Sequence, residues 1–354
     1  MALMQHRPLR RTLARASNAT PGTPPKQPPV ATLDLALQGG CALSAYTGGV
    51  LSAILRWPDV AEGRLIINRI SGASGGAILG SIITHALNMT GNPLHAADEL
   101  DKYWKMIIEA QTLSADTLLT CMLSASFRAA TLWINPYSTT ALSIAQGATA
   151  DSILKKHRRI LEEIITHPEY LHQGPVRLYV SAVEKIQSFG PLSAHNVKPI
   201  IFSGEDLDIE SILASTALEE GSPIRINGIP YWDPVFHPSA NPSLEPLQGT
   251  RSSHKLIVTL DDEDLHASNH NRNIVYGHIH QQTGQIPGAA ILSLTHGEGW
   301  LEDKRVCFTE EFLADLYAKG YKDGLAWIRD FEQYHLVLPP ITPEAHNDPD
   351  RQVA

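Results

Sequence analysis

The sequence has few cysteines, no long hydrophobic run and no excess of positive charge, and each absence excludes a class of protein. Its three cysteines, Cys41, Cys121 and Cys307, include no C-x-x-C pair, which argues against a disulfide framework or a thiolate zinc site and fits a reducing compartment. No stretch approaches the roughly 18 consecutive apolar residues of a membrane-spanning helix, so any membrane contact is expected to be peripheral. With 28 Lys and Arg against 37 Asp and Glu, the formal charge of −9 argues against a nucleic-acid-binding protein.

What is present is enough apolar sequence for a large globular domain. The chain has 354 residues, of which 43% are hydrophobic and 18% charged, so a substantial buried core is expected. Residues 1–32 form a basic, Pro-rich leader without an apolar run after its arginines, which predicts disorder rather than a secretory signal; a mitochondrial-type presequence is the alternative on composition. Residues 339–354 are expected to be a flexible polar tail. The missing signals predict a cytoplasmic protein.

Short apolar runs alternate with helical patterns along the chain. Strands are predicted at 33–38, 65–71, 177–183, 199–203, 255–260 and 289–294, and helices at 41–57, 77–87 and 308–334. This alternation implies an α/β fold with a mostly parallel sheet covered on both faces. Residues 93–160 are expected to be mainly helical, and within them the apolar stretch 117–134 is either a core helix or a mobile cap over an apolar site.

The most informative motif is Gly72-Ala73-Ser74-Gly75-Gly76, a G-x-S-x-G sequence between a predicted strand and a predicted helix. A tight strand-to-helix turn holds a serine hydroxyl clear of its neighbours, and flanking glycines allow strained backbone and a close approach of substrate. The helix N-terminus also places free N–H groups beneath a developing oxyanion. The other interpretation is a glycine turn in which Ser74 only caps the helix.

A second glycine loop, Gln38-Gly39-Gly40-Cys41, also joins a predicted strand to a helix. On neighbouring parallel strands the two loops would face each other and supply a nucleophile and separate oxyanion donors, the parts that acyl transfer needs. The alternative is a phosphate-binding loop, but the sequence has neither G-K-[ST] nor G-x-G-x-x-G at this position.

Three segments together resemble a known family. GGCALSAYTGGVL, GASGG and YWDP followed by NPSLEPL are similar to the patatin-like phospholipases of the bacterial type, and the resemblance covers roughly residues 33–335. It implies a three-layer α/β sandwich with a mixed, mostly parallel sheet, one acyl hydrolase domain over 33–338 and a helical cap region at about 93–160. The implied substrates are lipids or other acyl esters, hydrolysed to a free fatty acid and a lysolipid or alcohol.

The resemblance also implies a Ser-Asp dyad without a catalytic histidine. Ser74 would be the nucleophile and Asp233 its base. The backbone amides of Gly39, Gly40 and Cys41 would be the oxyanion donors, and Gly72, Gly75 and Gly76 would form the nucleophile elbow. No metal or organic cofactor is implied, because the dyad contains every chemical role. If stretch 117–134 forms an apolar entrance, medium or long acyl chains are expected to be preferred.

Three positions depart from the family pattern. Cys41 stands where the family commonly has a third glycine, and a positive φ there would cost on the order of 1 kcal/mol. Pro234 follows Asp233 in place of glycine, which removes an N–H and restricts Asp233 to extended backbone. Leu43 replaces the arginine of the plant-type loop. These departures keep open a second hypothesis, a patatin-like lipid-binding protein without turnover.

The chain has 16 histidines, and three groups of them suggest other chemistry. His296 is the best candidate for a Ser-His-Asp triad of the α/β-hydrolase order, with Asp233 or Asp261 as its third member. His237 could tune or replace the base, although a loop role is more typical. A metal site is the weakest hypothesis, because its candidate ligands lack acidic or cysteine partners at matching spacing: His266, His270, His278 and His280.

Overall fold

The computed structural model describes residues 31–112, 154–186, 192–218, 222–260, 279, 281–294 and 309–335. Several predictions from the sequence lie outside these residues: the leader before residue 31, stretch 117–134, His296 with Asp261, the four histidines of the weak metal hypothesis, and the C-terminal tail.

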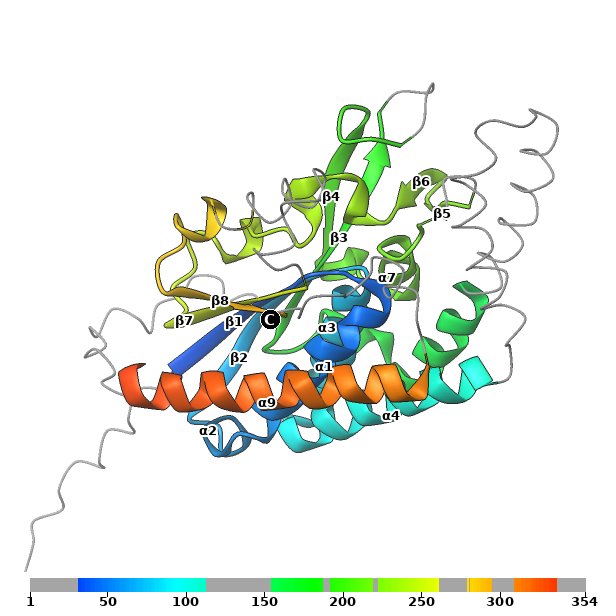
Figure 1. The fold of residues 1–354 in the computed structure, drawn as a ribbon. Helices are drawn as coiled ribbons and strands as arrows, with labels where there is room; N and C mark the ends of the chain where they lie inside the picture. The colour runs from blue at the N-terminus through cyan, green and yellow to red at the C-terminus, as the bar shows by residue number, and fades with distance from the viewer. Residues whose placement is uncertain are drawn as a thin grey trace, which may run out of the picture.

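The centre of the fold is a mixed β-sheet, which has eight strands among the described residues, in the order β5-β6-β3-β2-β1-β7-β8 with β4 paired to β3. Strands β3, β2, β1, β7 and β8 are parallel, whereas β4, β5 and β6 pair antiparallel. The strands are β1 (Ala31–Leu37), β2 (Leu65–Ala73), β3 (Arg177–Lys185), β4 (Val197–Ser203), β5 (Ile224–Ile226), β6 (Ile229–Trp232), β7 (His254–Thr259) and β8 (Ala289–Ser293). The predicted α/β class with a mostly parallel sheet between helices is confirmed (Figure 1).

The longer helices gather on one face of this sheet (Figure 1), and short helical turns such as Glu245–Leu247 pack on the other face. They are α1 (Ser44–Arg56), α2 (Pro58–Ala61), α3 (Gly75–Thr90), α4 (Pro93–Thr112), α7 (Ile209–Ala214) and α9 (Glu310–His335), and residues 154–164 are also helical. Connecting turns are the 3-10 helices η1 (Cys41–Leu43), η2 (Pro168–Leu171), η3 (Gly204–Asp206), η4 (Pro234–Phe236), η5 (Pro238–Ala240) and η6 (Glu245–Leu247).

The two faces of the sheet are buried differently, as the alternation of side chains along β1 shows. Leu33, Leu35 and Leu37 belong to the large core shared with α1, α3 and α4. Ala36 points the other way and belongs to a smaller cluster with Leu244 and six further apolar residues, which come from η6, β7 and the chain around residues 279–291. The second face is therefore covered, within the described chain, mainly by the segment that follows Asp233.

Helix α9 packs directly on α1, the helix that follows the first glycine loop. A Cβ added to Gly49 would lie 2.0 Å from the Tyr317 carbonyl oxygen, and one added to Gly320 would lie 1.9 Å from that of Tyr46, so the backbones are in contact. The Tyr46 hydroxyl donates to Asp323 at 3.2 Å, and the Trp57 indole donates to Glu332 at 2.8 Å. This contact fixes α1, and with it the end of the glycine loop, against the C-terminal helix.

Within the described residues the predicted strands and helices have counterparts, with ends that differ by at most three residues. Strand β1 begins at Ala31 rather than at residue 33, and α3 extends from Gly75 to Thr90 rather than over 77–87. Helix α9 begins directly after Thr309, whose hydroxyl accepts from the Phe312 amide and so caps the helix N-terminus. Among the residues that the structure describes, no helix is long and apolar enough to cross a membrane.

Candidate active site

Two loops meet where neighbouring parallel strands end. Leu37, the last residue of β1, pairs with Gly72 of β2, so the loop after β1 lies beside the turn after β2. A Cβ added to Gly39 would lie only 2.6 Å from the Cβ of Ser74 and 2.8 Å from the Ala73 carbonyl oxygen. The two loops are therefore in van der Waals contact, as their positions after neighbouring strands predict.

Ser74 occupies a strained turn between β2 and α3. Its backbone angles are φ +50° and ψ −123°, a region that non-glycine residues rarely adopt. Its carbonyl oxygen accepts from the amides of Ala77 and Ile78, and its own amide donates to the Ser215 hydroxyl at 2.8 Å. Gly76 permits the close packing of this turn, because a Cβ there would lie 2.3 Å from the Leu37 carbonyl oxygen. This is the geometry expected of a nucleophile elbow.

The sheet delivers Asp233 to the same place from the opposite direction. Strand β3 pairs with β4 along one edge and with β2 along the other. The pairing with β2 ends at Ser181, and beyond it, on the same edge, Val183 pairs with Trp232 of β6. Because β6 runs antiparallel to β3, it approaches the end of β2 head on. Asp233 is the first residue after β6, and Ser74 is the first residue after β2. Their meeting follows from this topology.

The Asp233 carboxylate is buried, with 1% of the residue exposed. Its Oδ1 accepts a hydrogen bond from the Val235 amide at 2.8 Å, whereas Oδ2 has no hydrogen-bond partner among the described residues. Burial raises the pKa of Asp233 to about 7, and the hydroxyl of Ser74 and the amide of Val235 act in the opposite direction. Ser74 thus lies close enough to stabilise the carboxylate, and the buried Oδ2, without a hydrogen-bond partner among the described residues, can receive a proton.

Pro234 does not prevent Asp233 from being oriented. Asp233 has the extended angles that a following proline imposes, φ −54° and ψ 137°, and it caps η4 with Pro234 as the first residue of that turn. The amide that Pro234 lacks is replaced by the next one, that of Val235, which donates to the carboxylate.

The amides of the glycine loop have different partners. Gly39 N–H donates to the side-chain Oδ1 of Asn241 at 2.8 Å, so in this conformation it is engaged, which differs from the expectation that it serves as an oxyanion donor. The next amide in the loop, that of Gly40, donates no hydrogen bond to a described residue. Cys41 comes next, with φ +51°.

The strain at Cys41 gives a testable prediction. Cys41→Gly is expected to raise the free energy of unfolding by up to about 1 kcal/mol, because glycine adopts a positive φ without steric cost. Urea denaturation would measure this difference. Cys41→Ala is the matched control, since alanine also removes the thiol but keeps the Cβ that causes the strain. Equal stability of the two variants would show that backbone strain is not the cause.

His237 is part of the loop structure. Its Nδ1 accepts from the Ser239 amide at 3.3 Å and lies 2.8 Å from the Ser239 hydroxyl, so the ring caps η5. This supports the loop interpretation over a role as base. In the part of the chain that the structure describes, no three His, Cys, Asp or Glu side chains come together as a metal site would require.

Two functional contacts could not be found from motifs. Ser215 supports the Ser74 amide, and Asn241 binds the Gly39 amide. The available signals were weak: Ser215 is a polar residue just after the apolar helix α7, and Asn241 precedes a proline in the loop after Asp233.

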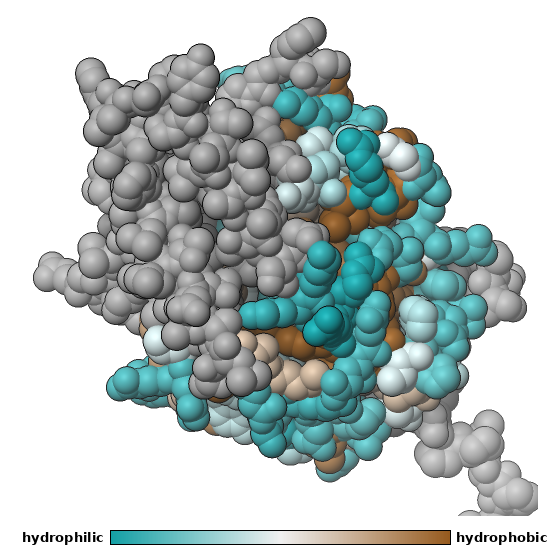
Figure 2. All heavy atoms as spheres, turned by 90° about the vertical axis from the view of Figure 1, so that its right-hand side faces the viewer, coloured by the Kyte–Doolittle hydropathy of each residue, from teal (hydrophilic) through white to brown (hydrophobic). Residues whose placement is uncertain are grey.

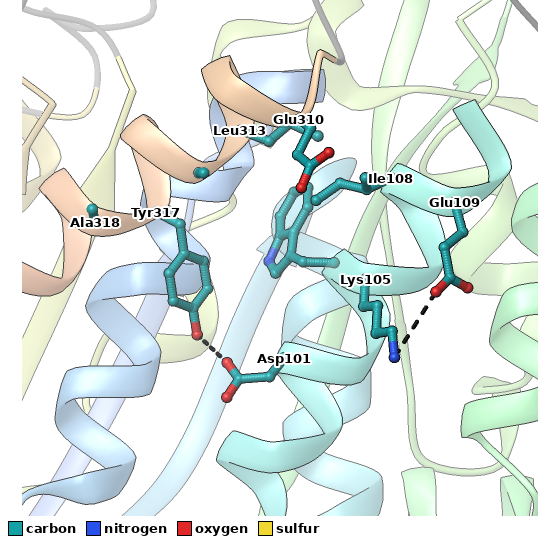
Figure 3. A pocket seen from close by; sticks show the side chains of 10 residues that line it. Asp101, Lys105, Ile108, Glu109, Glu310, Leu313, Tyr317 and Ala318 are labelled. Atoms are coloured by element: carbon teal, nitrogen blue, oxygen red, sulfur yellow. Dashed lines mark hydrogen bonds and ion pairs between the residues drawn. The ribbon is translucent and has the colours of Figure 1, made fainter. Parts of the chain in front are cut away.

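The structure also contains a pocket of about 580 Å³ between α4 and α9 (Figure 3). Its walls include Trp104, Ile108 and Leu313, and the Tyr317 hydroxyl donates to Asp101 at one side. None of the residues around Ser74 and Asp233 lines it. On the side of the molecule where α4 ends and α9 begins, hydrophobic side chains are visible in hollows between hydrophilic ones (Figure 2).

Comparisons with known proteins give distant structural matches only. No protein-family model and no curated protein sequence matches this chain. Among solved structures, VipD from Legionella pneumophila is 12% identical with a TM-score of 0.40, over 85% of this chain and 67% of VipD. ExoU from Pseudomonas aeruginosa, in complex with SpcU, is 14% identical with a TM-score of 0.35, over 87% of this chain and 52% of ExoU. This chain thus spans about half of ExoU.

Proposed function

We propose that this protein is a patatin-like serine acyl hydrolase that cleaves carboxylic ester bonds of lipids. The observation that carries the proposal is the pairing of Ser74, held in a strained elbow, with the buried Asp233, whose pKa is raised to about 7 and whose Oδ2 is open. A carboxylate with its ordinary pKa of about 4 is a weak base at neutral pH, whereas one near 7 is well matched to general base catalysis.

In the acylation step, Asp233 accepts the hydroxyl proton of Ser74 while Oγ attacks the carbonyl carbon of the ester. The Gly40 amide and the N-terminus of α3 stabilise the negative charge on the former carbonyl oxygen. The tetrahedral intermediate then collapses, the C–O bond of the ester breaks, and the alcohol leaves with the proton that Asp233 held. This leaves an acyl group on Ser74 and an ionised Asp233.

In the deacylation step, Asp233 takes a proton from a water molecule, and the resulting hydroxide attacks the acyl carbonyl. Collapse of the second intermediate breaks the bond to Oγ, the proton returns to Ser74, and a free fatty acid is released. One carboxylate therefore moves every proton in the cycle, and no histidine is needed.

A lipid substrate is supported by apolar side chains next to the buried base. Leu218 is 44% exposed and follows Ala217, whose carbonyl oxygen accepts from the Asp233 amide. Val235 is 47% exposed and its amide binds Asp233 Oδ1. Exposed apolar side chains on two segments that hydrogen-bond to Asp233 favour an acyl chain or a lipid surface over a strongly polar substrate. Contact with a membrane would be peripheral.

The test is covalent labelling of the full-length protein with a fluorophosphonate, read by intact mass, together with hydrolysis of 4-nitrophenyl butyrate. We expect one adduct on the wild type, no adduct on Ser74→Ala, and an unchanged adduct on Ser81→Ala, a buried serine of the same helix. Labelling that survives Asp233→Asn but fails on His296→Ala would assign the site to a Ser-His-Asp triad. Folded wild-type protein without an adduct would favour the lipid-binding alternative.

A further inference from the structure

A buried segment, residues 241–243, crosses three adjacent parallel strands at the level where β1 and β2 end. Asn241 Oδ1 accepts from the Gly39 amide just after β1 at 2.8 Å. The Ser243 carbonyl oxygen accepts from the Ser71 hydroxyl of β2 at 2.7 Å, and the Ser243 amide donates to the Ser181 hydroxyl of β3 at 3.3 Å. The segment therefore connects the loop that carries Asp233 to the strands that carry the other parts of the site.

The contact with Gly39 is the most consequential of the three. The glycine loop is held on one side by Gln38, whose amide donates to Val258 and whose side chain accepts from the Leu260 amide, and on the other by the Gly40 carbonyl oxygen, which accepts from the Leu43 amide. Between these points lie two consecutive glycines, which have no side chains to restrict their backbone. The hydrogen bond that the Gly39 amide donates to Asn241 Oδ1 fixes this amide.

We propose that Asn241 is a positioning residue for the glycine loop. It holds Gly39 against Ser74, so that the next amide, that of Gly40, stays in place as an oxyanion donor. This inference rests on the proposed function. The orientation of the Asn241 carboxamide is determined, because a backbone N–H requires the oxygen and not the nitrogen of the side chain as its partner. Asn241 itself is 5% exposed, so packing restricts it as well.

The role follows from how oxyanion donors act. They accelerate a reaction only when they are already oriented toward the charge that develops, so that no reorganisation is needed in the transition state. Without Asn241 the Gly39 amide would be buried without an acceptor, and the loop would relax toward water or another partner. Such relaxation weakens binding of the transition state far more than binding of the neutral ester, and it therefore lowers kcat rather than raising KM.

The experiment compares wild type and Asn241→Ala in hydrolysis of 4-nitrophenyl butyrate and in the rate of fluorophosphonate labelling. We expect kcat and the labelling rate to fall by about 10- to 100-fold, below the roughly 100- to 1,000-fold cost of deleting a donor itself, while KM changes less than about 3-fold. Hydrogen exchange of the peptide that contains Gly39 should become faster. If Asn241→Ala does not fold, Asn241→Ser withdraws the acceptor but keeps a polar side chain, with the same expected results.

Asn88→Ala is the matched control, because Asn88 is a half-buried asparagine at the far end of α3 whose Oδ1 likewise accepts a backbone amide, that of Val176 at 2.9 Å. It should lose stability without a change in kcat. Suppose that the wild type is labelled and that labelling depends on Ser74. The positioning role is then overturned if kcat of Asn241→Ala stays within about 3-fold of the wild-type value, or if the only change is in KM. Absence of Ser74-dependent labelling in the wild type would instead reject the proposed hydrolase, and the role of Asn241 with it.

Discussion

Asp233→Asn is expected to abolish ester hydrolysis and, at the same time, to make the protein more stable above neutral pH. Activity should fall by at least about 1,000-fold, because general base catalysis and the handling of every proton in the cycle depend on this carboxylate. Stability should rise, because the variant no longer has to hold an ionised group in a buried site where only Oδ1 is hydrogen-bonded. Hydrolysis assays and urea denaturation from pH 4 to pH 8 would measure both effects.

The sign of the stability effect follows from the raised pKa. Between the unfolded-state pKa of about 4 and the folded-state pKa of about 7, the folded protein holds a proton that the unfolded chain has released, so wild-type stability falls as the pH rises through this window. Each unit of pKa difference corresponds to about 1.4 kcal/mol, which gives the variant an advantage of up to about 4 kcal/mol at pH 8 and almost none below pH 4. The same ionisation predicts that wild-type kcat/KM declines below pH 7.

Asp34→Asn provides the control for this result. Asp34 is also a fully buried aspartate of the sheet, but both of its oxygens accept hydrogen bonds, from Thr250 at 2.8 Å and from Ser252 at 2.7 Å. An amide nitrogen there would face a donor, so this variant should lose stability and keep its activity. If Asp233→Asn were less stable than the wild type at pH 8, burial of the ionised carboxylate would not destabilise the folded protein. The assignment of Asp233 as a base with a raised pKa would then be wrong.

Local sequence patterns predicted those parts of the site that lie at the ends of strands. The glycines around Ser74 and the pair Gly39-Gly40 each follow an apolar run and precede a helical pattern, and this order alone indicates two loops above parallel strands. The angles of Ser74 and the contact of Gly39 with it agree with that prediction. The sequence also contains a signal for the role of the Val235 amide, which replaces the amide that Pro234 lacks. An aspartate before proline is a common cap of a short helical turn.

Contacts between distant segments could not be predicted in this way. The bond between Gly39 and Asn241 joins residues 202 positions apart, and that between Ser74 and Ser215 joins residues 141 apart. Asn241 reaches the site after the antiparallel strands β5 and β6, whereas Ser215 comes before them, directly after α7. Neither residue belongs to a periodic pattern. Their roles emerge only from the three-dimensional arrangement, since a hydrogen bond to a backbone amide requires nothing of the sequence except an acceptor in reach.

Gly39→Ala is expected to have the second large effect, and it tests whether contact between the glycine loop and Ser74 matters for function. The new methyl group would lie 2.6 Å from the Cβ of Ser74 and 2.8 Å from the Ala73 carbonyl oxygen, closer than non-bonded atoms can approach. Either the loop or the elbow must move, so we expect kcat/KM to fall by at least about 100-fold, as for the loss of an oxyanion donor. Overpacking should also reduce the free energy of unfolding by about 1–3 kcal/mol.

A matched control separates this effect from general strain in glycine turns. Gly63 lies in the turn before β2, has a positive φ of 74°, and has no atom within 4 Å of an added Cβ. Gly63→Ala should therefore lose about 1 kcal/mol of stability from backbone strain and keep full activity. The decisive quantity is activity at equal stability, measured at a temperature where both variants are folded. If Gly39→Ala then hydrolyses esters as fast as Gly63→Ala, the loop is not close to Ser74 in the working protein, and an oxyanion hole built from it is excluded.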